Sequence, residues 1–88
     1  MDRIQLTEEQ IRYAVGATVD KLYKRLEQKG YGTFASRHEI LGVITEEYKE
    51  VVDAVHEKNP EAIKQELLDI AVGAIFGYAC MNEKTVDW

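Results

Sequence analysis

Length, composition and charge exclude several classes of protein. The 88 residues form a single domain, 1–88, too small for a lone three-helix fold to be more than marginally stable, so we expect burial against a partner. With 45% hydrophobic and 31% charged residues the chain is not disordered, and its net charge of −5 without a basic stripe argues against nucleic-acid binding.

The first predicted helix begins near Thr7 and ends at Gly30. Thr7 and Gln10 have the spacing of a capping box. In the loop that follows, Tyr31 and Phe34 either anchor the core, which is the favoured interpretation, or stack on a base. Apolar residues recur at helical spacing along the helix and predict its buried side: Ile11, Ala14, Val15, Val19, Leu22 and Leu26.

The second predicted helix begins after Ser36 and ends near Lys58. Ser36 and Glu39 give the S-x-x-E pattern of a capping box ahead of an apolar run. Because several of its apolar residues are β-branched and lower the helix propensity, we expect packing to hold this helix. The predicted buried side consists of Ile40, Val43, Ile44, Val51 and Val55.

The third predicted helix begins at Asn59-Pro60-Glu61, where asparagine suits the N-cap, proline the first helical position and glutamate the first turn. Between residues 67 and 81 it is apolar nearly all round, apart from one acid and two glycines. Such a helix is normally surrounded by protein, which three helices of one chain can hardly do, so the pattern predicts a second subunit. One apolar face should consist of Ile63, Leu67, Ile70, Ala74 and Tyr78.

No segment has the features of a signal peptide or a membrane span. Residues 1–7 carry charge without an apolar core, and no stretch approaches the ~20 apolar residues that cross a bilayer. The single cysteine, Cys80, lies in an apolar run and is interpreted as a small buried hydrophobe rather than a nucleophile. From the absence of such segments we expect a cytoplasmic protein without a membrane partner. We further expect the tail, Asn82 to Trp88, to extend a helix or to dock on a partner.

Four acids on the second and third helices form the candidate site. Glu47 and Glu50 lie one turn apart on one helix face, and Glu66 and Asp69 repeat that spacing. The short turn between the helices makes them antiparallel, and Glu50 and Glu66 lie at similar distances from it along the chain. The spacing therefore predicts two pairs of carboxylates that face each other across a helical hairpin.

Divalent cations would remove the repulsion among four neighbouring carboxylates. Oxygen donors without His or Cys favour Mg²⁺, with Mn²⁺ as an alternative, over Zn²⁺, and Mg²⁺ held in this way commonly binds substrate phosphates. The opposing interpretation is a solvated helix surface, because each i, i+3 acid pair alone is a weak signal. Acids such as Glu66 and Asp69 rarely lie in an apolar run unless they are paired or metal-bound, which favours the metal site.

The combined pattern resembles a known family. Glu46-Glu47-Tyr48-Lys49-Glu50, then fifteen residues, then Glu66-Leu67-Leu68-Asp69 is similar to the E-E-x-x-E and E-x-x-D motifs of the MazG-like all-α nucleoside triphosphate pyrophosphohydrolases. The resemblance covers about residues 36–81. Its departure is length, because the chain is shorter than many relatives and its tail does not align with their substrate-contacting segments.

The resemblance implies an all-α helical hairpin that completes a four-helix-bundle-like site on dimerisation, in homodimers or dimers of dimers. It implies Mg²⁺-dependent cleavage of a nucleoside or deoxynucleoside triphosphate, (d)NTP, to the monophosphate and pyrophosphate. By this analogy the metal ligands are Glu47, Glu50, Glu66 and Asp69. The catalytic acids would be Glu46, which orients the attacking water, and Glu47, either of which accepts its proton.

Two other classes of function stay open. One is a non-catalytic helical interaction module or subunit with a solvated acidic face, which would bind no divalent cation. The other is a carboxylate-bridged di-iron protein, but that class uses Glu-x-x-His pairs and neither helix has a histidine three residues after its glutamates. Gly73 and Gly77, which continue the acidic face, either leave room for a nucleotide or allow close helix packing.

Overall fold

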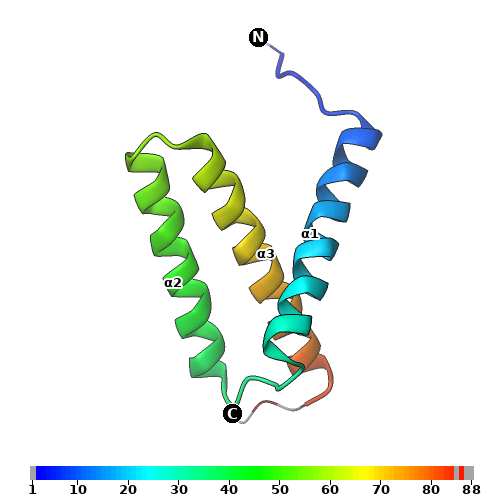
Figure 1. Cartoon of the computed structure of the whole chain (residues 1–88), viewed down its shortest axis with the longest axis vertical. Coiled ribbons are helices and arrows are strands. Elements are labelled where there is room, and N and C mark those ends of the chain that lie inside the picture. Colours follow the sequence, from blue (N-terminus) through cyan, green and yellow to red (C-terminus); the bar gives the residue numbers. More distant parts are fainter. Residues whose placement is uncertain (1, 85, 87–88) are drawn as a thin grey trace.

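The fold is all-α, as the sequence predicts. A computed structural model describes residues 2–84 and 86, which contain three helices: α1 (Glu8–Lys29), α2 (Arg37–His56) and α3 (Pro60–Asn82). Helices α2 and α3 form the predicted antiparallel hairpin, and α1 packs on α3 (Figure 1). Within the described residues, α1 and α2 do not approach each other closely, so the three helices form an open arrangement around α3.

The helix starts are set by the predicted capping residues. The Thr7 and Gln10 side chains each bond the other residue's backbone N–H, which completes the capping box of α1. Asn59 caps α3 by accepting from the N–H of Ala62. At α2 the box is only half formed, because Ser36 accepts from the N–H of Glu39 but the Glu39 carboxylate accepts from Ala35 instead.

The helix ends follow from backbone conformation. Gly30 ends α1 at φ 85°, a region that favours glycine, and its N–H bonds the carbonyl of Leu26. Helix α2 ends at His56, two residues before the predicted Lys58. Lys58 itself has φ 56°, and the N–H groups of Lys58 and Asn59 bond carbonyls of the last helical turn. This is the geometry of a Schellman ending, which usually has glycine at this position.

The buried core of one chain is small. Buried hydrophobic side chains come from each helix and from the tail: Leu26, Ala54, Val72, Cys80 and Val86. Cys80 is thus the buried hydrophobe that its apolar surroundings predict. Helix α3 ends at Asn82 and the tail residue Val86 packs into the core, while Thr85, Asp87 and Trp88 lie outside the described residues.

Several residues predicted to be buried are exposed in the single chain. On α3, Leu67 is 53% exposed and Tyr78 74%, while on α1 Ile11 and Val15 are about half exposed. The prediction placed these residues on buried helix faces, but one chain has too few helices to cover them.

No helix in the described part of the chain is long and apolar enough to cross a membrane.

Candidate metal centre

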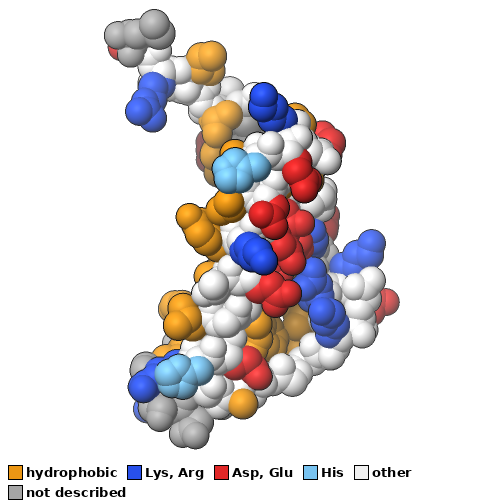
Figure 2. Space-filling view, turned by 90° about the vertical axis from the view of Figure 1, so that its left-hand side faces the viewer, with side chains coloured by type: hydrophobic (Ala, Val, Ile, Leu, Met, Phe, Trp, Pro, Cys, Tyr) orange, Lys and Arg blue, Asp and Glu red, His pale blue; other side chains and the backbone are white. Residues whose placement is uncertain are grey.

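The helical hairpin brings the four predicted acids together. Glu47 and Glu50 from α2 meet Glu66 and Asp69 from α3, and each offers one carboxylate oxygen within 4.8 Å of all the others. The i, i+3 spacing places each pair on one face of its helix, and α2 packs against α3 in the hairpin, so the two pairs meet. Figure 2 shows acidic side chains in a band that runs lengthwise along the side of the molecule drawn there.

Two oxygens in the cluster lack the partners that buried oxygens need. The Oε2 atoms of Glu47 and Glu66 are shielded from solvent and accept no hydrogen bond from any described residue. Glu47, Glu66 and Asp69 are half-buried and Glu50 is exposed. A buried acceptor without a partner costs about 1–3 kcal/mol, and more for a charged group, so both oxygens favour binding a cation.

The crowding of carboxyls changes their protonation. The hydrogen bond that a protonated Glu66 can share with Glu50, then burial, then the charges of Glu50, Asp69 and Glu47 raise the pKa of Glu66 to about 7. Burial, then the charges of Glu50 and Asp69, raise the pKa of Glu47 above its ordinary value of 4.5, and the nearby Arg25 opposes this rise. The metal-free cluster therefore holds protons more strongly than isolated carboxyls do.

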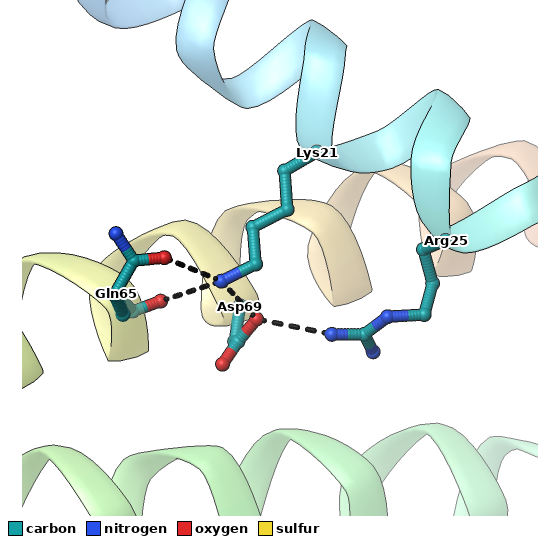
Figure 3. Close-up of polar contacts among 4 residues, drawn as sticks. All are labelled: Lys21, Arg25, Gln65 and Asp69. Atoms are coloured by element: carbon teal, nitrogen blue, oxygen red, sulfur yellow. Dashed lines mark hydrogen bonds and ion pairs between the residues drawn. The ribbon is translucent and has the colours of Figure 1, made fainter.

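Two cations from α1 reach the cluster, and sequence reasoning missed both. Lys21 Nζ lies 2.8 Å from Asp69 Oδ1, and an Arg25 guanidinium nitrogen lies 3.1 Å from the same atom (Figure 3). Lys21 also donates to Gln65. The available signal was the i, i+4 spacing of the two basic residues beside the apolar stripe of α1, but that spacing does not reveal that their common partner is Asp69 of α3.

The donor set fits Mg²⁺ or Mn²⁺. All four side chains offer oxygen, and neither histidine of the chain belongs to the cluster. Hard divalent cations prefer such oxygens, whereas Zn²⁺ sites usually include nitrogen or sulfur. The two buried oxygens without hydrogen-bond partners belong to Glu47 of α2 and Glu66 of α3, so both helices would supply ligands to a cation held here.

A cavity of about 350 Å³ adjoins the acid cluster. Residues from all three helices and from the loop after α1 line it. Its charged lining comes from Arg25, Lys29, Glu46, Glu47 and Asp69, and its apolar lining from Leu22, Leu26, Phe34, Val43, Val72 and Phe76. A cavity of this size that combines apolar side chains with a few charged groups can hold a small molecule.

The remaining candidate residues are placed around this cavity. Glu46 is exposed and lies outside the cluster of four, but it lines the cavity. Phe34 packs edge-to-face on Phe76 with ring centroids 5.3 Å apart, which supports the interpretation that it anchors the core. Phe34 also lines the cavity. Gly77 is buried, and a Cβ there would lie 3.4 Å from Ile40 of α2, which supports close helix packing.

The position of Gly73 is consistent with both interpretations of the α3 glycines, close helix packing and space for a nucleotide. A Cβ at Gly73 would lie 3.5 Å from Ile44 of α2, an ordinary contact distance, so the helices also pack closely here. The same residue lines the cavity, so its missing side chain leaves space beside the acids.

The comparison with protein families agrees with the motif. A family model described as the MazG nucleotide pyrophosphohydrolase domain matches residues 35–86. This range contains α2, α3 and all four acids of the cluster, whereas α1 lies outside it. No curated protein and no solved structure matches the chain. The resemblance drawn from the E-E-x-x-E and E-x-x-D pattern is confirmed.

Proposed function

The chain belongs to the MazG nucleotide pyrophosphohydrolase domain family, and we propose that it is a metal-dependent enzyme that cleaves a nucleoside triphosphate to the monophosphate and pyrophosphate. The substrate is a nucleoside or deoxynucleoside triphosphate, and the cation is Mg²⁺ or Mn²⁺. In the reaction water attacks either the α- or the β-phosphorus. The bond between that phosphorus and the oxygen that joins the α- and β-phosphates breaks, and the oxygen of the water stays on the attacked phosphorus.

The acid cluster carries this proposal. Four carboxylates converge within 4.8 Å, and two of their oxygens are buried without a partner. A solvated acidic face, as in an interaction module, has no reason to bury carboxylate oxygens away from water. A triphosphate would be repelled by these acids alone, so its binding would require the acids to hold a cation that offsets their charge.

The side chains divide the work between binding and proton transfer. Glu47, Glu50, Glu66 and Asp69 would hold the cation, which when bound neutralises phosphate charge and lowers the pKa of a water. Glu46 or Glu47 accepts the proton of the attacking water, because both line the cavity beside the cluster. The apolar part of the cavity takes the nucleoside and excludes water from the reacting phosphates.

We further propose that the working form is a homodimer or a dimer of dimers. Exposed apolar residues on α1 and α3 support it, because a partner helix would cover them and complete a four-helix-bundle-like site.

A panel of ribo- and deoxyribonucleoside triphosphates tests the proposed function. Pyrophosphate release should require Mg²⁺ or Mn²⁺, stop when EDTA is added and return when the cation is restored. An Asp53→Asn variant is the matched control for Glu50→Gln, because Asp53 is an exposed acid one turn further along α2 and outside the cluster. Activity that persists in EDTA, or equal activity of Glu50→Gln and the control, would contradict the proposal.

A further inference from the structure

The two cations beside Asp69 use their donors differently. An ammonium group has three N–H donors, and Lys21 has three acceptors around it. These are Asp69 Oδ1 at 2.8 Å, Gln65 Oε1 at 3.0 Å and the Gln65 carbonyl oxygen at 3.3 Å. Lys21 is therefore fully engaged on the surface of α3, as Figure 3 shows.

Arg25 has donors to spare. A guanidinium group has five N–H donors, and among the described residues only Asp69 Oδ1, 3.1 Å from one nitrogen, accepts from it. Its side chain is 34% exposed and lines the cavity, together with Glu46, Glu47 and Asp69. The free donors of Arg25 thus lie where the cavity meets the acid cluster.

The net charge of the cluster indicates when the free donors of Arg25 become available to a ligand. When all four carboxyls are ionised, the cluster with Lys21 and Arg25 has two more negative than positive charges, which one divalent cation would balance. Once such a cation binds Asp69, that carboxylate no longer depends on Arg25 for a counter-charge. The guanidinium is then available to another anion on the cavity side.

We propose that Arg25 is a phosphate-binding residue, which donates from α1 to the phosphate chain of a substrate bound beside the acid cluster, where the four acids would hold the cation. The planar fork of arginine suits phosphate oxygens, and such charge-assisted hydrogen bonds are stronger than neutral ones. This role rests on the proposed function. Arg25 itself lies outside the residues that the family model matches, which begin after α1.

Binding of inorganic tripolyphosphate tests this role without depending on the base. Calorimetry in excess Mn²⁺ compares the wild type with Arg25→Gln and with Lys24→Gln, an exposed residue of α1 that loses the same charge. Arg25→Gln should weaken tripolyphosphate binding by about tenfold or more, because a charge-assisted contact is lost, and Lys24→Gln should change it by less than about twofold. Affinity for Mn²⁺ alone should be unchanged or higher in Arg25→Gln, because a competing cation leaves Asp69.

A role limited to balancing Asp69 gives a different result. In that case Arg25→Gln would bind Mn²⁺ more tightly but tripolyphosphate as the wild type does, which overturns the inference. Equal weakening by Arg25→Gln and Lys24→Gln overturns it too, because it reports only long-range charge. If Arg25→Gln does not fold, Arg25→Lys keeps the charge without the fork and should still bind more weakly. Wild-type binding with no Arg25 effect removes this inference alone, whereas no wild-type binding removes the proposed function as well.

Discussion

The side-chain chemistry of the site centres on carboxylates that the fold forces together. The sequence placed these four acids level on facing helices, because two i, i+3 pairs lie at similar distances from the turn of one hairpin, and the motif resemblance singled them out from the other acids. Lys21 and Arg25 escaped prediction because their contact with Asp69 depends on how α1 packs on α3, and residue spacing carries no information about that packing. The burial of individual carboxylate oxygens likewise became visible only in three dimensions.

Removing one carboxylate of the cluster should weaken metal binding. Glu50→Gln and Asp69→Asn should lower the Mn²⁺ affinity by at least about tenfold, since even partners of a ligand contribute 10–100-fold. In EDTA Glu50→Gln should be at least as stable as the wild type, because it relieves repulsion, whereas Asp69→Asn also loses the ion pairs of Asp69 with Lys21 and Arg25. Calorimetry with Mn²⁺ measures the effect, with Asp53→Asn as the control. A variant that binds Mn²⁺ as the wild type does would show that its residue is not a ligand.

Protonation of the cluster predicts a pH dependence of the metal-free protein. The pKa of Glu66 is raised to about 7 in the folded state from an ordinary 4.5, so the folded protein binds a proton more tightly than the unfolded one. The free energy of unfolding should therefore fall as the pH rises from about 4.5 to about 7.

Denaturant melts between pH 5 and 8 in EDTA measure this slope. Glu66→Gln, which removes the titrating group, should flatten it, and excess Mg²⁺ should also flatten it by replacing the protons. A metal-free protein that gains stability across this range, with a slope unchanged in Glu66→Gln, would contradict the raised pKa.

The helices were predictable where short side-chain motifs control them. The caps at Thr7, Ser36 and Asn59 and the stop at Gly30 all involve residues within a few positions of one another, so the sequence contains the whole determinant. The end of α2 was placed two residues late because the helix turns back at Lys58, a residue type with no preference for a left-handed backbone.

The left-handed backbone at Lys58 predicts a stabilising substitution. Lys58→Gly should raise the free energy of unfolding by up to about 1 kcal/mol, because glycine adopts φ 56° without the steric cost that a side chain brings. Lys64→Gly, in the interior of α3, is the control and should lower it by about 1 kcal/mol. Urea denaturation measures both, and a loss of stability in Lys58→Gly would show that the lysine side chain makes a compensating contact.

At the scale of the whole molecule, the sequence predicts more apolar surface than one chain can cover. The apolar run of α3 was recognised, but which of its residues lie inside one chain and which face outward depends on the positions of α1 and α2. Ile70 is half-buried, whereas Leu67, Ile75 and Tyr78 are substantially exposed. Figure 2 shows exposed hydrophobic side chains beside the acidic band. A patch of this kind on a small chain favours self-association.

Oligomerisation should therefore be measurable and sensitive to α3. Light scattering at micromolar concentration should give at least twice the chain mass of 10.1 kDa. Tyr78→Glu should shift the protein toward the monomer, because it places a charge on a surface that a partner covers, while Lys64→Glu on the polar start of α3 should not. A stable monomer near 10.1 kDa in the wild type would refute the dimer.

The products of the reaction reveal which bond of the substrate is broken, and ³¹P NMR identifies these products directly. With Mg²⁺ and a substrate triphosphate, a nucleoside monophosphate and pyrophosphate should form in equal amounts, so that the pyrophosphate signal, from two equivalent phosphorus atoms, has twice the area of the monophosphate signal, and neither should grow in EDTA. The same reaction in ¹⁸O-water should label one of these two products at a single phosphorus. Growth of orthophosphate and a nucleoside diphosphate, or no reaction with any triphosphate of the panel, would contradict the assignment.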